Sequence, residues 1–146
     1  MSLARVHNFA ISLDGFGTGE GQSADAHFGH AGERLHEWMF ATRWWQPGGS
    51  GGVDDAFAQQ FYPGIGKARK AADGKDVRIG GGATMIRDFL AAGLIDYMHV
   101  VVVPILLGRG VRLWDGGLEG LEKDYQVEAT SSASGVTHVT FTRTGV

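Results

Sequence analysis

The sequence predicts an α/β fold, in which a mostly parallel sheet carries an antiparallel hairpin at its C-terminal edge. Three observations predict it. Residues 77–103 read as strand, glycine turn, helix and strand. The second of these strands, residues 97–103, is so uniformly apolar that both of its faces must be covered, which is typical of a central parallel strand. Residues 125–131 and 136–143 flank the turn residues Ser134-Gly135 and predict the hairpin.

The first half of the chain predicts one strand and one long helix. Residues 6–13 form the strand, which ends at Asp14-Gly15. Apolar residues at spacings of three and four predict a helix over residues 33–45, and Pro47 follows its end. Its buried face would hold Leu35, Trp38, Met39 and Thr42. Beyond it the pattern is ambiguous, with a short helix at 54–61 and the end of another at 67–72.

The second half contains the clearest unit of the sequence. A strand at residues 77–79 leads through the glycines 80–82 into a helix over 83–92, and Gly93 is its C-terminal cap. The strand 97–103 follows, and the connection is expected to be right-handed. The inward face of the helix would hold Met85, Ile86, Phe89 and Leu90.

The composition favours one soluble domain. The chain has 146 residues, 43% of them hydrophobic, which is enough for a core. The net charge of −3 and the lack of a basic run argue against nucleic acid as a partner. The absence of cysteine excludes disulfides and Cys-ligated zinc. The longest apolar run, residues 100–107, is far shorter than the roughly 20 residues of a membrane helix. With no signal-peptide pattern at its start, we expect a cytoplasmic protein without a membrane partner.

Glycine is the compositional outlier, with 24 residues in the chain. The glycines cluster in segments that predict loops, at residues 15–21, 48–52, 64–66, 80–82 and 108–120. The cluster at 80–82 joins a strand to a helix, so that free N–H groups of the first helical turn would form an anion site. Thr84 adds a hydroxyl to it. The spacing is neither G-x-G-x-x-G nor a P-loop, and a simple tight turn is the alternative.

Several further motifs carry a resemblance to a known family. They are Gly81-Gly82-Ala83, the run AGLID at 92–96, PILLGRG at 104–110, RLW at 112–114 and FAISLDGF at 9–16. Together they resemble the signature of the RibD C-terminal-domain family, whose fold is similar to that of dihydrofolate reductase. The resemblance runs in order through the chain and is most specific in its second half.

The resemblance implies a fold, an activity and a cofactor. The fold would be a three-layer α/β/α sandwich, formed as a single domain over residues 1–146 and present as a homodimer. The activity would be hydride transfer from NADPH to a small pterin-like or ribosylamino-pyrimidine substrate. The alternative is a homodimeric nucleotide-binding protein on the same scaffold that has lost catalysis, because a fold does not fix a function.

The resemblance also implies a set of site residues. The cofactor's pyrophosphate would lie against the glycine turn and the start of the helix, at Gly80, Gly81, Gly82, Ala83 and Thr84. The nicotinamide would meet the backbone of Ala10 and Ile11 at the end of the first strand, and Leu107 and Gly108 on its other side. These positions agree with the general rule that ligands of open α/β sheets bind at the carboxyl ends of strands.

The substrate side is less determined by the sequence. Asp14 is the candidate proton donor, with an ordered water as the other source, and an Asx-turn is its structural alternative. Ser12 and Trp38 are candidate substrate contacts, although the pattern favours the core for Trp38. No metal is expected, although His27, His30 and His36 are close in sequence.

Two departures from the family pattern bear on function. On the resemblance, a segment of the family that would carry a cation for the adenosine 2′-phosphate has no counterpart between residues 66 and 67. The first helix places Leu35, not a carboxylate, where a dihydrofolate reductase binds its pterin. The second departure argues against folate reduction and leaves another substrate open.

Overall fold

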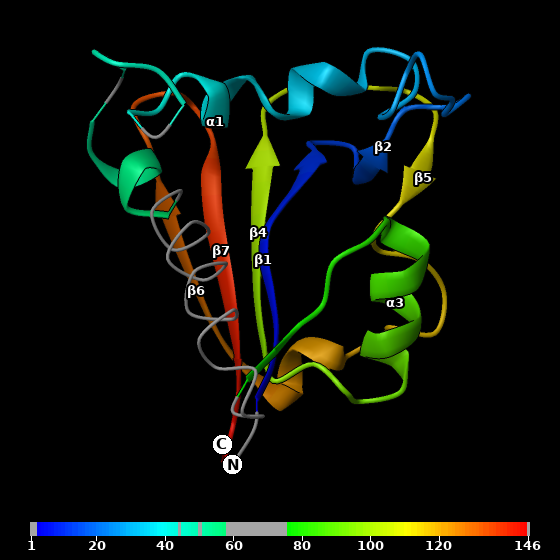
Figure 1. Ribbon diagram of the computed structural model, residues 1–146. Helices are drawn as coiled ribbons and strands as arrows, with labels where there is room; N and C mark the ends of the chain where they lie inside the picture. The colour runs from blue at the N-terminus through cyan, green and yellow to red at the C-terminus, as the bar shows by residue number, and fades with distance from the viewer. Residues whose placement is uncertain (1–2, 44, 50, 58–75, 146) are drawn as a thin grey trace.

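The computed structural model describes residues 3–43, 45–49, 51–57 and 76–145 of the chain. Its centre is a five-stranded sheet with the order β3-β1-β4-β7-β6 (Figure 1). The strands are β1 (Leu3–Ser12), β3 (Asp76–Arg78), β4 (Tyr97–Val103), β6 (Tyr125–Ser131) and β7 (Thr137–Arg143). The α/β class and the C-terminal hairpin are therefore confirmed.

The directions of the strands divide the sheet into two parts. β1 runs parallel to both β3 and β4, while β7 is antiparallel to both β4 and β6. The described sheet therefore has as many antiparallel as parallel pairs, whereas the sequence predicts a mostly parallel sheet. The reason is that β4 pairs with the hairpin on its second edge, so a strand buried on both faces need not lie between two parallel neighbours.

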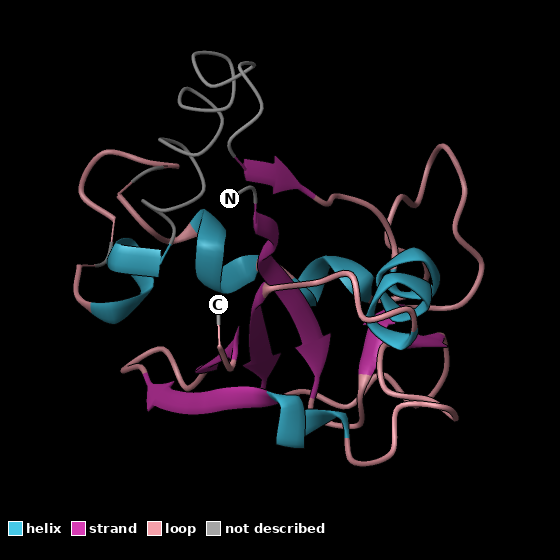
Figure 2. Ribbon diagram, turned by 90° about the horizontal axis from the view of Figure 1, so that it is seen from below, coloured by secondary structure: helices cyan, strands magenta, loops and turns pink. Residues whose placement is uncertain are grey.

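Helical segments cover the two faces of this sheet (Figure 2). Helix α3 (Ala83–Ala91) lies on one face, and the short helices η1 (Gly32–Leu35) and α1 (Glu37–Phe40) lie on the other. Alternation along β4 shows the two faces directly. Met98 and Val100 pack in the cluster of α3, whereas Val101 and Val103 pack in the cluster of η1 and α1. The layers are thus helix, sheet and helix.

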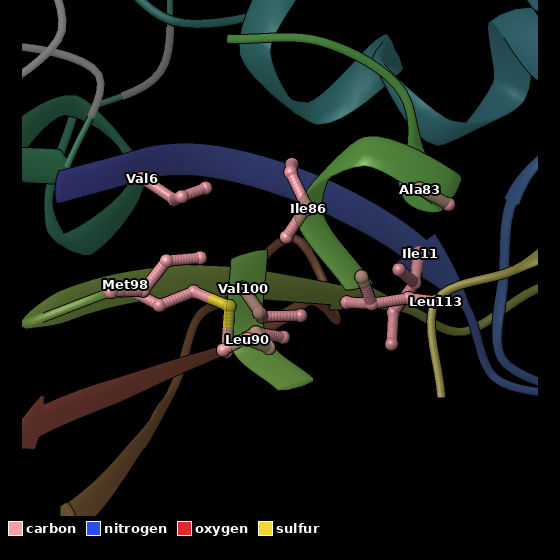
Figure 3. Close-up of a cluster of buried hydrophobic side chains, with 9 residues drawn as sticks. Val6, Ile11, Ala83, Ile86, Leu90, Met98, Val100 and Leu113 are labelled. Atoms are coloured by element: carbon pink, nitrogen blue, oxygen red, sulfur yellow. The ribbon is translucent and has the colours of Figure 1, made fainter. Parts of the chain in front are cut away.

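The core beneath α3 shows how few residues fix this helix (Figure 3). Ala83, Ile86 and Leu90 are at most 2% exposed and pack on Val6 and Met98 of the sheet. Met85, predicted to point inward, is 44% exposed instead. The buried residues are spaced by three and four from Ala83, and this stripe leaves Met85 to one side. Gly93 caps the helix as predicted.

The helix predicted over residues 33–45 is wrong in length, although its buried face is confirmed. Leu35, Trp38, Met39 and Thr42 are all buried, but α1 ends at Phe40. The carbonyl of Met39 accepts the hydroxyl of Thr42 at 2.6 Å, and the N–H of Arg43 donates to Asp55 at 2.9 Å. Side chains have therefore taken the backbone partners that a continuing helix would need.

A second, small sheet lies in stretches that the sequence predicts as loops. β2 (Phe16–Thr18) pairs antiparallel with β5 (Val111–Arg112), and η2 (Leu121–Asp124) precedes β6. Strands of two and three residues are too short to leave a periodic pattern in the sequence. This pair ties the segment after β1 to the segment after β4.

Other predictions lie partly outside the described residues. Residues 53–57 are helical, which agrees with the start of the predicted helix at 54–61. The remainder of that helix lies outside the described part of the chain. So do the predicted helix end at 67–72 and the junction of residues 66 and 67, where the family segment has no counterpart. Within that part, none of the helices has the length and apolarity needed to cross a membrane.

Candidate functional site

A crevice opens where β1 and β3 part. The two strands pair only from Leu3 to Arg5 on β1 and from Asp76 to Arg78 on β3. After this, β1 leads to η1 and α1 on one face, and β3 leads to α3 on the other (Figure 1). Such a divergence of adjacent parallel strands is where open α/β sheets bind ligands. The crevice has a volume of about 420 Å³.

One wall of the crevice is the glycine turn at residues 80–82. A Cβ atom at Gly80 or Gly82 would meet no other atom within 4 Å, so the backbone is open to an approaching group. Gly81 has a φ of +141°, and a side chain there would collide with Met85. The backbone conformation at position 81 therefore requires glycine. At Gly80 and Gly82 the lack of a side chain leaves the backbone uncovered.

The N-terminus of α3 adjoins this wall. Its N-cap is Gly82, without a side-chain cap and without an acidic residue in the first turn. The first N–H groups of a helix have no partner inside it, and the helix dipole favours an anion there. A second hollow of about 450 Å³ lies against Ala83, Thr84 and Met85, and Gly82 lines both hollows. The structure therefore brings Ala10 and residues 80–82 to the crevice, and residues 82–84 to the hollow beside it.

Buried polar atoms without a partner gather in the crevice. The atoms are His7 Nδ1, both polar atoms of the Asn8 amide, Thr18 Oγ1 and His36 Nδ1. None of them has a hydrogen-bond partner among the residues that the structure describes. Because buried polar groups are normally paired, four such residues in one crevice indicate a polar ligand.

Both histidines of the crevice favour the neutral form. Burial lowers the pKa of His36 from its ordinary value. Burial also lowers the pKa of His7, and the positive charges of Arg78 and Arg5 lower it further. A neutral imidazole has one donor and one acceptor nitrogen, so each ring offers hydrogen bonds without a charge.

A second group of predicted residues is held together by Asp14. Its carboxylate accepts a hydrogen bond from the Ser12 hydroxyl and from the N–H groups of Leu107 at 3.1 Å and Gly108 at 2.8 Å. Burial raises the pKa of Asp14, but the hydrogen bonds from Ser12, Gly108 and Leu107 outweigh this and lower it. The ionised carboxylate thus braces the segment after β4 against the turn after β1.

The structure places the remaining predicted residues in the core or beside this brace. Ile11 is 3% exposed and Trp38 is 5% exposed, each inside an apolar cluster. Trp38 also contacts the ring edge of His138, with ring centroids 5.2 Å apart. Neither lines the crevice, and neither do Ser12, Leu107 or Gly108. The roles assigned to these residues stay predictions.

Sequence reasoning did not find several of the residues that line the crevice. Asn8 interrupts the alternation of its strand, and this polar residue amid apolar ones was the available signal. Thr18 and Gln22 lie in a predicted loop that gave no signal. Arg78 is the last residue of the short strand β3, where a cation is most simply interpreted as a solvated strand end.

The three histidines considered as metal ligands make other contacts. His30 Nε2 lies 3.0 Å from the carbonyl of Leu107, and the His36 ring packs on Phe28 with centroids 4.2 Å apart. In the described ranges, three or more His, Asp or Glu side chains never gather in a way that could hold a metal ion.

Three of the solved structures that are similar to this chain are bacterial proteins. A diaminohydroxyphosphoribosylaminopyrimidine deaminase/5-amino-6-(5-phosphoribosylamino)uracil reductase from Thermotoga maritima has a TM-score of 0.51 and 12% identity, over 97% of this chain and 56% of that one. Acinetobacter baumannii RibD has a TM-score of 0.49 and 16% identity, over 99% and 58%. A riboflavin biosynthesis protein candidate from Shewanella sp. PV-4 has a TM-score of 0.48 and 19% identity, over 98% and 99%.

These comparisons differ in what they establish. At such identities, the likeness to the Thermotoga protein shows the fold alone, and this chain spans little more than half of that protein and of the Acinetobacter one. A search of curated proteins finds no match. The family model described as the RibD C-terminal domain matches residues 67–139, which is half of the chain and includes the glycine turn, α3 and β4. The chain therefore belongs to the RibD C-terminal domain family.

Proposed function

We propose that this protein transfers a hydride from NADPH to a small heterocyclic substrate of the pterin or ribosylamino-pyrimidine kind. Its family implies a pyrimidine-reductase-like activity, and the proposal adds the cofactor and the substrate class. The observation that carries it is the crevice between β1 and the glycine turn, where buried polar atoms lack partners beside an uncapped helix N-terminus. A cytoplasmic location is part of the same proposal.

The residues of the crevice fit a dinucleotide. Gly82, Ala83 and the Thr84 hydroxyl would hold the pyrophosphate, because the open backbone allows close approach and the first turn of α3 offers free N–H groups. The bound cofactor supplies the hydride. The chain binds the cofactor, orients it toward the substrate and excludes water from the site. Arg78 lines the crevice. Burial lowers the pKa of its guanidinium, but this group starts from so high a pKa that it remains a cation.

The proton source follows from the geometry of Asp14. Its three hydrogen-bond donors favour the ionised carboxylate and oppose its use as an acid. We therefore assign Asp14 the role of positioning Leu107 and Gly108 beside the nicotinamide, and an ordered water supplies the proton. Ser12 is fully buried with its hydroxyl bonded to Asp14, and Trp38 is buried in an apolar cluster, so in this proposal the two support the site and do not contact the substrate.

Titration of the protein with NADPH and NADH, followed by tryptophan fluorescence and energy transfer to the dihydronicotinamide, tests the cofactor. We expect NADPH to bind more tightly than NADH. Thr18→Val should weaken binding without loss of stability, since the Thr18 hydroxyl has no partner in the described part of the fold. Thr142→Val, on the exposed end of β7, is the matched control. Failure of both dinucleotides to bind would refute the cofactor assignment.

The alternative is a nucleotide-binding protein on this scaffold without catalysis. The engaged carboxylate of Asp14 favours it, because the candidate acid is already committed to the backbone. The two functions differ in whether bound NADPH is oxidised when a pterin or an aminopyrimidine is added. Loss of the dihydronicotinamide absorbance would support the reductase, and a lasting absorbance with every acceptor would support the alternative.

A homodimer is the assembly that we propose. The face of the sheet beneath α3 continues past this helix onto β6 and β7, where Val127 is 44% exposed and Val139 and Phe141 line an apolar groove of about 570 Å³. Light scattering at micromolar concentration should give twice the chain mass, and Val127→Glu should reduce it to the monomer. A monomeric wild type would contradict the proposal. Thr130→Glu, on the opposite face of β6, is the control.

A further inference from the structure

The first strand contains a bulge at the wall of the crevice. In the pairing of β1 with β4, His7 and Asn8 together lie opposite the single residue His99, and the register resumes at Phe9. Asn8 has a φ of +54°, in the left-handed region that asparagine tolerates better than most residues. Its N–H donates to His99 Nδ1 at 3.2 Å. An imidazole side chain thus provides a partner for the N–H of the extra residue.

This bond begins a chain whose direction is fixed. A backbone N–H can only donate, so His99 Nδ1 is the acceptor, and the neutral ring carries its proton on Nε2. That proton is donated to His138 Nδ1 at 2.9 Å, which leaves the proton of His138 on Nε2. His138 Nε2 then donates to Asp54 Oδ1 at 2.7 Å. We call His99, His138 and Asp54 the histidine chain.

The histidine chain is enclosed. His99 is 0%, His138 is 1% and Asp54 is 2% exposed. The ring of Phe57 stacks on both imidazoles, with centroids 4.3 and 4.1 Å away. Each hydrogen bond of the histidine chain can be donated in one direction only, and packing against Phe57 fixes the orientation of both imidazole rings. Such an arrangement holds the backbone of Asn8 in place.

The side chain of Asn8 is the group that this device positions. Asn8 is 7% exposed and lines the crevice, yet neither its oxygen nor its nitrogen finds a partner in the described residues. A buried polar group left unpaired destabilises the folded state, because it has given up its hydrogen bonds to water. A primary amide presents an acceptor and a donor side by side, so its complement is another carboxamide or a lactam, which returns two hydrogen bonds.

We propose that Asn8 recognises an amide group of the ligand in the crevice and that the histidine chain is its positioning device. The inference rests on the proposed function, because the nicotinamide carboxamide and the lactam edge of a pyrimidine or pterin both present this pair of groups. It adds to the proposed site a residue that determines specificity, Asn8, and the histidine chain that holds it in place.

The test uses Asn8→Gly, which keeps the positive φ accessible and deletes the amide. Calorimetry on the full chain would measure four probes: NADPH, its 3-acetylpyridine analogue, 2′-phospho-ADP-ribose and uracil. If Asn8 binds the nicotinamide, the variant loses about tenfold in NADPH affinity and none for 2′-phospho-ADP-ribose, which lacks that ring. The analogue keeps the carbonyl but lacks the amide N–H₂, so it can make only one of the two hydrogen bonds, and the substitution should cost it only part of that loss. If Asn8 binds the substrate, only uracil binding is weakened.

The other outcomes separate the two proposals. Equal affinities of wild type and Asn8→Gly for every probe that binds would overturn the inference alone, since a buried water then satisfies the amide. If wild type binds no NADPH but binds uracil in an Asn8-dependent way, the cofactor proposal fails and the inference stands. If no probe binds at all, both fail.

A double-mutant cycle tests the positioning role. His99→Phe removes both hydrogen bonds and keeps a ring against Phe57, whereas His99→Asn keeps an acceptor near the position of Nδ1. We expect His99→Phe to weaken the amide-bearing probe by severalfold, His99→Asn to restore part of that affinity, and His99→Phe to have no further effect in the Asn8→Gly background. A merely structural role would lower the melting temperature without this coupling, and additive effects on affinity would overturn the positioning role.

Discussion

At the scale of single residues, Asp14 shows how a site prediction changes when its partners are known. The turn S-L-D-G suggests either a catalytic acid or a capped turn, and the structure has the carboxylate bound to a distant segment. Two N–H groups from residues 107 and 108 reach its two oxygens from more than ninety positions away. Hydrogen bonds to a charged acceptor are the stronger kind, and these join the ends of β1 and β4.

Replacing Asp14 by asparagine should destabilise the protein by about 1–3 kcal/mol. One oxygen becomes an N–H₂ group, which then opposes a backbone N–H donor. Urea unfolding would measure the change, and Asp25→Asn, an exposed carboxylate of the following loop, is the control. A loss no larger than that of the control would show that the brace contributes nothing in solution.

At the scale of elements, α3 has the clearest boundaries in the molecule. Gly93 has a φ of +71°. Its N–H donates to the carbonyl of Leu90, and the N–H of Leu94 donates to the carbonyl of Phe89, each at 3.0 Å. This pair of bonds is the Schellman arrangement, which satisfies carbonyls that the helix end leaves open. The helix can therefore end sharply and return the chain to β4.

Gly93→Ala should cost about 1 kcal/mol or slightly more, because alanine disfavours the left-handed conformation. Gly116→Ala is a matched control, since no atom lies within 4 Å of its added Cβ and its φ is not in the positive range. Thermal unfolding of both variants checks the prediction. A melting temperature lowered equally in the two would mean that the loss comes from the added methyl group and not from the backbone conformation.

The elements also show what the sequence could and could not predict. The unit β3–α3–β4 was predicted to within one residue at each boundary, because periodicity, glycine and cap agree there. The helix over 33–45 failed in length, since Asp55 and the Thr42 hydroxyl compete for its backbone groups. The bulge at Asn8 depends on His99, far away in sequence, so no local pattern could reveal it. Glycines mark the crevice, but its polar lining arises from tertiary contacts.

At the scale of the whole molecule, buried histidines couple stability to pH. Burial, together with His138 and His7, lowers the pKa of His99 to about 3 from its ordinary value of 6.5. Burial also lowers the pKa of His138, against the hydrogen bond with Asp54, which raises it. The folded state therefore binds fewer protons than the unfolded chain in this range, so stability is fully present above pH 6.5 and is lost as pH falls toward 3.

The free energy of unfolding should fall by up to about 1.4 kcal/mol per pH unit for His99 as pH drops below its ordinary pKa. Urea unfolding between neutral pH and mild acid measures this slope. His99→Gln should start less stable and show a shallower slope, because the group with the lowered pKa has been removed. Parallel slopes for wild type and His99→Gln would contradict the assignment.

The position of β1 also has a consequence for how the molecule is made. Among the described strands, β1 comes first in the sequence and becomes an inner strand, and both of its neighbours, β3 and β4, are synthesised much later. Until β3 has emerged, both edges of β1 lack their partners, and until residue 103 has emerged the edge that pairs with β4 stays open, which invites pairing with other chains. Such distant pairings also slow folding. We expect translation arrested before β4 to yield aggregating fragments, and the protein to depend on chaperones during synthesis more than its size would suggest.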